Sequence, residues 1–437
     1  DAVTLIIGRT APRRRATPPK RTIPGLENLA GALSDALDLV GVDDVAHGKR
    51  VGIMAAECAR VAGWPEDEVL FMFDLGLLHD IGVSSTRTHS NLVGMFDWAG
   101  SQVHCEVGCG LLKGFAPFAR MAEPVRLHHT RWDQLVAAMP AEGGPERSVA
   151  LQANLIYLVD RVDALAASHY ADGSLLLSTR SIREEIARHV STYFAPELVE
   201  LFLQASLPEA FWLNLEPRSI QACLADRLLN APAAPASMGD LRQLAEIFSR
   251  IVDAKSPFTA EHSLGVARVA RFLARRMGVS GMNCEKIEIA GLLHDLGKLR
   301  VPDEILEKPG RLEPGERMTM NAHSFETFQI LRNIEGFDEI APWAAYHHEE
   351  PGGTGYPYRL KGESLPLEAR ILRVADIFQA MIQNRPYRSG LSAGDVRTFM
   401  QDFAARGKVD GDVVAVLLPV LSEAMEIARP GLPTLAA

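Results

Sequence analysis

The chain has 437 residues, of which 47% are hydrophobic and 23% charged, the composition of a globular protein too long for one core. A formal charge of −10 argues against a dedicated binder of nucleic acid or anionic membranes, because such proteins concentrate Lys and Arg. No apolar run approaches the roughly 18 residues of a membrane span, and five cysteines form no paired framework, so we predict a reduced, cytoplasmic protein without a membrane span.

The N-terminal segment differs in composition from the rest of the chain. Its apolar stretch, Val3 to Ile7, is short and is followed rather than preceded by basic residues, with prolines among them. This order is not that of a secretory signal. We predict a flexible basic tail over residues 1–24.

Most of the remaining chain repeats its apolar residues at helical spacing. Residues 262–278 place five of them on one face: Val266, Val269, Phe272, Leu273 and Met277. Alternating strand patterns with hairpin turns are scarce. The predicted fold class is therefore all-α.

One segment, NAPAAPASMG at residues 230–239, is rich in Pro and Ala and carries no charge. Such a composition is typical of a linker. It divides the chain into a first domain, residues 25–229, and a second domain, residues 240–437.

Both domains carry the same ladder of polar residues. In the second domain the ladder consists of His262, His294, Asp295, His323, His347, His348 and Asp376. In the first it consists of His47, His79, Asp80, His104, His128, His129 and Asp160. The first two histidines are 32 residues apart in both domains, and the single histidine precedes the His-His pair by 24 in both. The repeat predicts two tandem helical bundles related by internal duplication.

The ladder has the residue types of a metal site. A lone histidine on an apolar helix is usually a satisfied core residue, but ten of the chain's 13 histidines fall on the two ladders. Imidazole and carboxylate suit Fe, Mn, Co, Ni and Zn. We therefore predict a metal site in the second domain.

The stretch GLLHDLGK, residues 291–298, adds a phosphate-directed element. An adjacent His-Asp pair can leave one helix end together, and one carboxylate can bridge two ions about 3.5–4 Å apart. Lys298 follows one short turn later, where it could contact a phosphate oxygen or protonate a leaving alkoxide. A surface lysine at a helix end would explain the same position without chemistry.

Two further stretches of the second domain predict substrate contacts. In HHEEPGGTGYP, residues 347–357, the glycines, Gly355 among them, allow a backbone bend near a ligand, and Pro357 fixes its exit. Tyr356 could stack on a base or bond a phosphate. Arg385 and Arg388 in NRPYR could clamp phosphate, or they could form a solvated helix face.

These motifs, in the order HDLGK, His323, HHEEPGGTGYP, RVADIFQAM and NRPYR, resemble those of the HD-GYP family of phosphodiesterases within the HD superfamily. The first domain resembles the wider superfamily only, as a divergent HD domain. The resemblance implies tandem HD-type bundles, with one ion held by His262, His294, Asp295 and Asp376. It implies a second ion held by Asp295, His323, His347 and His348, and a phosphate contact from Lys298.

The resemblance also implies an activity. It is hydrolysis of 3′,5′ cyclic dinucleotides, cyclic di-GMP or 3′,3′-cGAMP, to linear pGpG or GMP by a hydroxide that two divalent ions activate. Fe or Mn is expected, with Co, Ni or Zn as alternatives. Phe258 stands where some members carry a third-metal glutamate, which predicts a dinuclear site. A GGDEF cyclase domain is the implied protein partner, and a homodimer is a further expectation.

The first domain keeps the ladder but loses the accessory residues. Val83 stands at the Lys298 position, and HHTRWDQLVAA replaces the glycine loop. Three interpretations remain: it binds metal and acts on another phosphate substrate, it is a silent regulator, or its ladder packs without metal.

Two alternatives to the phosphodiesterase prediction belong to other classes. One is a cyclic di-GMP receptor or scaffold with little turnover, and the other is an HD phosphohydrolase for a different nucleotide. The complete ligand set disfavours the first, and the Gly-Tyr-Pro stretch with NRPYR disfavours the second.

Overall fold

The computed structural model describes residues 31, 34–41, 46–98, 100–139, 145–230, 237–255, 262–334, 336–384 and 389–429. Several predictions therefore lie outside the described residues. They are the tail at 1–24, the middle of the linker at 231–236, and the side chains of Phe258, Arg385 and Arg388.

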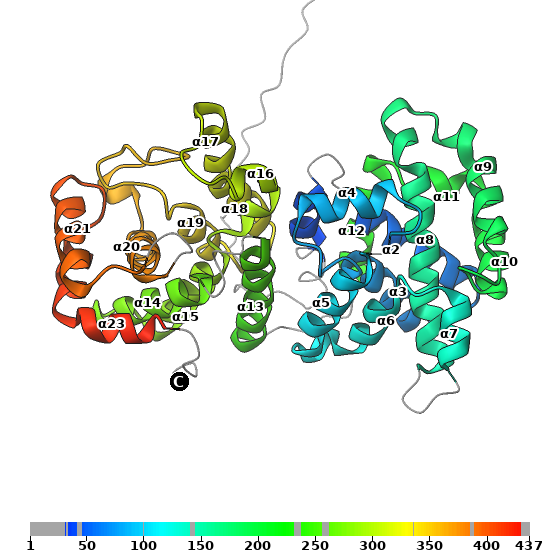
Figure 1. The fold of residues 1–437 in the computed structure, drawn as a ribbon, viewed down its shortest axis with the longest axis horizontal. Coiled ribbons are helices and arrows are strands. Elements are labelled where there is room, and N and C mark those ends of the chain that lie inside the picture. Colours follow the sequence, from blue (N-terminus) through cyan, green and yellow to red (C-terminus); the bar gives the residue numbers. More distant parts are fainter. Residues whose placement is uncertain are drawn as a thin grey trace, which may run out of the picture.

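The described part of the chain consists of helices and their connections (Figure 1). Its sole β contact is an isolated bridge between Val190 and Phe194. The all-α prediction is confirmed. Figure 1 shows two lobes, the first built from the elements up to α12 and the second from α13 onward.

The first lobe contains η1 (Asp38–Gly41), α2 (His47–Val61), α3 (Glu66–Leu78), α4 (Thr86–Gly94), α5 (Gln102–Lys113), η2 (Ala116–Met121), α6 (Ala122–Leu127), α7 (Trp132–Ala138), α8 (Arg147–Asp172), α9 (Leu175–Arg188), α10 (Pro196–Ala205), α11 (Glu209–Leu213) and α12 (Pro217–Asn230). In the long helix α8, most residues between Ala150 and Ala166 are buried.

The second lobe contains α13 (Met238–Lys255), α14 (His262–Arg276), α15 (Gly281–Leu293), η3 (Leu296–Arg300), α16 (Asp303–Leu306), α17 (Pro314–Asn321), α18 (His323–Leu331), α19 (Ile340–Ala345), η4 (Gly362–Ser364), α20 (Leu367–Ile382), α21 (Ala393–Ala405), α22 (Gly411–Leu417), η5 (Leu418–Val420) and α23 (Leu421–Ile427). The apolar face predicted for residues 262–278 lies on α14, where Val266, Val269 and Leu273 are buried.

Glycines let the central helices of each lobe approach closely. A Cβ on Gly76 of α3 would lie 2.4 Å from the Cα of Gly52 in α2. The counterpart in the second lobe is Gly291 of α15, whose Cβ would lie 2.7 Å from the Cα of Ala267 in α14. Because no side chain separates these helices, a histidine at the start of one can reach the His-Asp pair at the end of the other.

A second glycine places the turn after each His-Asp pair against the next histidine. A Cβ on Gly297 would lie 2.0 Å from the backbone oxygen of His323, and a Cβ on Gly82 would lie 2.0 Å from that of His104. Real Cβ atoms do not approach a carbonyl oxygen so closely, so only glycine fits these turns.

The two lobes touch where a carboxylate of the second meets the start of α4. Asp303, the first residue of α16, accepts a hydrogen bond from Ser85 Oγ at 2.8 Å and from the next two backbone N–H groups at 3.2 Å. A carboxylate at a helix N-terminus pairs N–H groups that lack helical partners. Ser85 follows Asp80 closely and Asp303 follows Asp295 closely, so this contact joins the segments behind the two His-Asp pairs.

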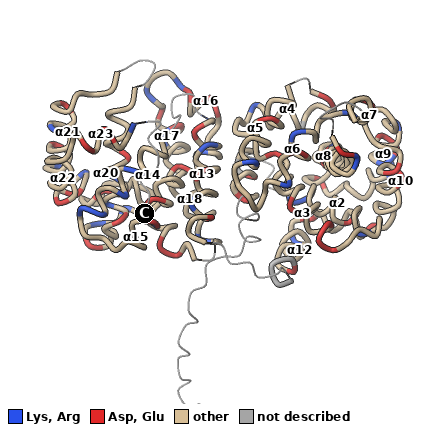
Figure 2. The backbone as a smooth tube through the Cα atoms, turned by 90° about the horizontal axis from the view of Figure 1, so that it is seen from below, with Lys and Arg blue, Asp and Glu red and all other residues tan. Residues whose placement is uncertain are grey.

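Charge is distributed over both lobes. Figure 2 shows basic and acidic segments interspersed along the tube in both lobes. Among the described residues, no helix is both long and apolar enough to cross a membrane.

The tight turns give a first prediction. Gly297→Ala should destabilise the protein by about 1–3 kcal/mol, because the new methyl group overlaps the backbone of His323. Gly281→Ala is the matched control, since a Cβ there meets nothing within 4 Å. Thermal unfolding of the two variants would test this, and a Gly297→Ala melting temperature equal to that of the control would contradict it.

Candidate metal centres

In the second lobe, the predicted ligands come from the ends of four helices and the middle of a fifth. Elements α14 and α18 begin with a histidine, α15 and α19 are followed by the His-Asp and His-His pairs, and α20 supplies an aspartate from its interior. The seven side chains are His262, His294, Asp295, His323, His347, His348 and Asp376. The structure therefore brings together every predicted second-domain ligand.

One half of this cluster surrounds one oxygen of Asp295. Its Oδ1 lies 3.4 Å from His323 Nε2 and 3.8 Å from His347 Nε2, and these two nitrogens are 3.3 Å apart. His348 completes the group with a ligand atom within 4.8 Å of those of the two histidines.

The other half surrounds Asp376 and the second oxygen of Asp295. His262 Nε2 and His294 Nε2 lie 3.2 and 3.9 Å from Asp376 Oδ1. His294 Nε2 also lies 3.3 Å from Asp295 Oδ2. Asp295 thus turns one carboxylate oxygen toward each half, which is the arrangement that a bridging ligand requires.

Backbone carbonyls fix the tautomers of three histidines. Each donates its Nδ1–H to a carbonyl three residues earlier, at 2.6–2.7 Å: His294 to Gly291, His323 to Met320 and His347 to Ala344. Their Nε2 atoms consequently face the cluster, where each neutral imidazole can offer a lone pair to an ion.

Two atoms of the pair at the centre are buried without a hydrogen bond. They are His294 Nε2 and Asp295 Oδ1. A buried polar atom without a partner is unfavourable and needs a physical reason. A bound cation would supply one, so the residues present fit a metal site.

Burial and neighbouring charges shift the pKa values of the side chains in this cluster. Burial lowers the pKa of His294, but Asp295 and Asp376 outweigh burial and raise it to about 9. Burial lowers the pKa of His323 to about 4. Burial would raise the pKa of Asp295, but His294 and Lys298 hold it well below its usual range.

Lys298 lies beside the bridging carboxylate. Its Nζ is 2.5 Å from Asp295 Oδ2, and its side chain is about one-fifth exposed at 22%. Thr327 holds this turn in place, since its Oγ1 accepts from Gly297 N at 2.9 Å and donates to the His294 carbonyl at 3.2 Å. Sequence reasoning missed Thr327; its position one helical turn after His323 was the signal.

A buried glutamate organises the Gly-Tyr-Pro loop. Glu349 accepts hydrogen bonds from Tyr358 N at 2.6 Å and Leu360 N at 2.9 Å. The loop folds back so tightly that a Cβ on Gly355 would lie 2.4 Å from a backbone nitrogen. Tyr356 is thereby placed over His348, with ring centroids 4.7 Å apart. Sequence reasoning gave no role to Glu349, although it directly follows the His-His pair.

The first lobe repeats this geometry around Asp80. Its Oδ1 lies 3.2 Å from His104 Nε2 and 3.7 Å from His128 Nε2, and these nitrogens are 3.2 Å apart. His129 completes this group of ligand atoms within 4.8 Å.

The remaining first-lobe positions also gather. His47 Nε2 lies 3.3 Å from Asp160 Oδ1, and His79 Nε2 lies 3.5 Å from Asp80 Oδ2. The lobe lacks the accessory parts: Val83 is buried at the Lys298 position, and α7 follows His129 where the second lobe has its glycine loop.

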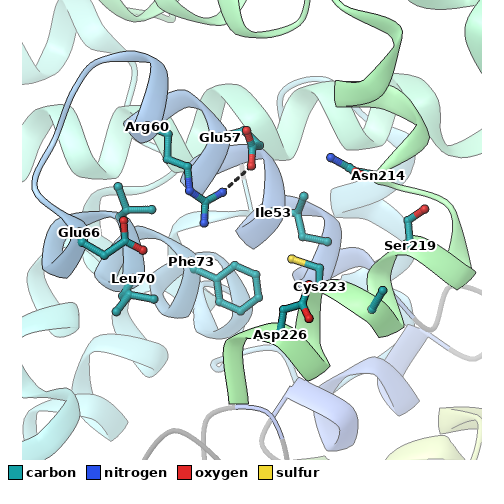
Figure 3. Close-up of a pocket in the computed structure, with 12 residues that line it drawn as sticks. Ile53, Glu57, Arg60, Glu66, Leu70, Phe73, Asn214, Ser219, Cys223 and Asp226 are labelled. Carbon is teal, nitrogen blue, oxygen red and sulfur yellow. Dashed lines mark hydrogen bonds and ion pairs between the residues drawn. The ribbon is translucent and has the colours of Figure 1, made fainter. Parts of the chain in front are cut away.

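A separate cavity of about 530 Å³ lies in the first lobe, between α2, α3 and α12 (Figure 3). Ile53, Phe73 and Cys223 line it, and Glu57 and Arg60 form an ion pair at its wall. None of the ladder residues of either lobe lines this cavity. The candidate metal centres are therefore buried clusters distinct from it.

The chain is similar to an HD-domain family model and to proteins named as cyclic-dinucleotide phosphodiesterases. A family model described as HD domain matches residues 246–413. Over 397 residues the chain is 35% identical to a 3′3′-cGAMP-specific phosphodiesterase of Vibrio cholerae, covering 88% of this chain and 89% of that relative. It is 32% identical over 201 residues to a cyclic di-GMP phosphodiesterase response regulator of Xanthomonas campestris, covering 44% of this chain and 53% of that relative.

The fold has a solved counterpart. The crystal structure of a cyclic GMP-AMP specific phosphodiesterase of Vibrio cholerae superposes with a TM-score of 0.62 at 24% identity, covering 92% of this chain and 98% of that one. At this identity the likeness concerns the fold, and it extends over both lobes.

The raised pKa of His294 gives a second prediction. In the metal-free protein His294 carries a proton below about pH 9, and an ion at its Nε2 must displace that proton. The apparent Mn²⁺ affinity of the second lobe should therefore fall about tenfold per pH unit as the pH drops from 9 to 7. Calorimetric titration at several pH values measures this. An affinity that does not change with pH would contradict it, and His294→Gln provides the control without this proton.

Proposed function

The chain belongs to the HD-GYP family of the HD superfamily, and we propose that its second domain hydrolyses 3′,5′ cyclic dinucleotides at a centre of two divalent ions. The single observation that carries the proposal is the position of Asp295 between two groups of side chains. Its Oδ1 faces the group with His323, and its Oδ2 faces the group with His294 and Asp376. The relative that covers both domains is itself a cyclic-dinucleotide phosphodiesterase.

Ligand roles follow from this arrangement. We assign His262, His294 and Asp376 to one ion, His323, His347 and His348 to the other, and Asp295 to both. When bound, two such ions polarise a phosphoester and provide a water-derived nucleophile at neutral pH. The Nδ1 hydrogen bonds of His294, His323 and His347 to backbone carbonyls restrict ring rotation and keep these three rings oriented.

Lys298 is the residue proposed to act on the phosphate. Its ammonium lies at the bridging carboxylate and remains partly exposed, so it can reach an incoming anion. A fixed cation at this point stabilises negative charge that develops on the phosphate oxygens, and it can give a proton to the leaving alkoxide. Gly355, Tyr356 and Pro357 form the adjoining wall, where the Tyr356 ring offers a stacking surface for a base.

Substrate and partner assignments belong to the same proposal. The relative named for 3′3′-cGAMP matches both domains, whereas the one named for cyclic di-GMP matches 44% of the chain, which supports testing both dinucleotides. The two ions are proposed to be Fe or Mn, because imidazole and carboxylate ligands suit either metal. Arg385 and Arg388 remain proposed phosphate contacts, and a GGDEF domain at the Gly-Tyr-Pro loop and a homodimer remain proposed assemblies.

A third prediction tests the role of Lys298. Lys298→Ala should lower kcat on cyclic di-GMP or 3′,3′-cGAMP by about 100-fold or more, because a charge that stabilises the transition state is lost. Metal content should not change, since Lys298 is not a ligand. Arg300→Ala is the matched control: Arg300 lies on the same 3-10 turn, is about half exposed and pairs with Glu326.

Steady-state kinetics with metal analysis on each preparation would decide between the outcomes. Equal activity of the Lys298→Ala and Arg300→Ala variants, with metal in place, would remove Lys298 from the mechanism. Full metal occupancy without turnover of either dinucleotide in the unaltered protein would instead favour a receptor.

A further inference from the structure

The histidine cluster of the first lobe has two halves, and one of them is better suited to bind a metal ion. The better half consists of Asp80, which follows α3, His104 in α5, and the pair His128 and His129, which follows α6. All four ligand atoms lie within 4.8 Å of one another. In the second lobe, the same positions are those proposed to hold one of the two catalytic ions.

Distances in this half match the coordination sphere of a small divalent ion. Around a tetrahedral ion with bonds of about 2.0–2.1 Å, neighbouring ligand atoms are separated by about 3.3–3.4 Å. The three distances among Asp80 Oδ1, His104 Nε2 and His128 Nε2 are 3.2, 3.2 and 3.7 Å. The corresponding distances in the second lobe are 3.4, 3.3 and 3.8 Å.

The atoms of this half are also prepared to bind a cation. His128 donates its Nδ1–H to the Val125 carbonyl at 2.6 Å, so its Nε2 lone pair faces the cluster. Asp80 Oδ1 is buried without a hydrogen bond, as Asp295 Oδ1 is in the second lobe. Buried polar groups that lie this close together are unfavourable unless an ion or a proton lies between them.

The other half is already neutralised by a protein cation. Arg161, which is 2% exposed, donates to Asp160 Oδ2 at 2.9 Å and is anchored by the backbone oxygens of Leu92 and Met95. The second lobe has Ile377 after Asp376. Unlike Lys298, which is partly exposed and can turn away from its carboxylate, this buried guanidinium stays beside Asp160 and repels a divalent ion.

The histidines of this half still present atoms that could face an ion. His47 lies between two carboxylates, with Nδ1 2.8 Å from Asp163 Oδ2 and Nε2 3.3 Å from Asp160 Oδ1. His79 Nε2 lacks a hydrogen bond and forms a candidate ligand group with His47 and Asp80, so Arg161 beside Asp160 is the feature that separates this half from its counterpart in the second lobe.

We propose that the first lobe holds one divalent ion of the zinc class, bound by Asp80, His104, His128 and His129, and that its other half holds none. Three imidazole nitrogens and one carboxylate oxygen fill the four positions that zinc prefers in closed, structural sites. Because Val83 and α7 replace the lysine and the glycine loop, this ion ties α3, α5 and α6 together and does not hydrolyse a substrate.

The proposal can be tested apart from the catalytic site. The full chain carrying His294→Ala and His347→Ala lacks a member of each second-lobe ligand group. After saturation with Zn²⁺ and gel filtration, elemental analysis should find one zinc ion per chain. Adding His128→Gln should bring the content to zero. Adding His47→Gln should leave one, and so should His169→Gln, a matched histidine control that bonds to Ser174 outside the cluster.

Thermal unfolding supplies an independent readout. Zn²⁺ should raise the melting temperature of the doubly substituted chain and of its His47→Gln version, but not that of its His128→Gln version. No zinc on the folded double variant would overturn the proposal and leave a shared proton between the nitrogens. Two zinc ions per chain would contradict the claim that Arg161 keeps an ion out of the other half of the cluster. If the double variant does not fold, the unaltered chain should bind one zinc ion more than His128→Gln does, and equal contents would overturn the proposal.

Discussion

Burying a carboxylate among histidine nitrogens is unfavourable unless a cation is shared between them, and the architecture of each lobe follows from this constraint. Glycines at Gly291 and Gly297 remove the side chains that would separate α14 from α15 and η3 from α18. The helix ends can then converge on Asp295. A bundle with ordinary side chains at these two positions could have the same helices but would not bring the ligand atoms within reach of one ion.

The two lobes share this scaffold and differ in the charges around it. Beside Asp295 lies Lys298, a partly exposed cation that can meet a phosphate, whereas the first lobe has the buried Val83. Beside Asp160 lies Arg161, a buried cation that has no counterpart beside Asp376. We propose that these single differences decide which half of each cluster holds a metal ion. The hydrogen bonds of Asp303 to the start of α4 join the two lobes.

The sequence predicted the all-α fold and the seven second-lobe side chains that the structure brings together, because residue spacing and helical periodicity are local properties of the chain. It did not predict the roles of Thr327 and Glu349, since their partners are backbone groups that only the tertiary fold brings near. Arg161 was visible beside Asp160, but its effect depends on burial, which neighbouring residues alone do not reveal. Roles for Arg385 and Arg388, which lie outside the described residues, stay predictions.

The most direct test of the dinuclear centre is Asp295→Asn, a change that keeps the shape of the side chain but replaces one carboxylate oxygen with an amide NH2 group, which cannot bind an ion. Metal content and turnover of cyclic di-GMP and 3′,3′-cGAMP would be measured on one anaerobic preparation of each protein. If Asp295 bridges two catalytic ions, the variant retains its fold, binds fewer ions and loses at least about 100-fold in turnover. Wild-type turnover with the wild-type number of ions would show that Asp295 is not the bridge and that the proposed centre is wrong.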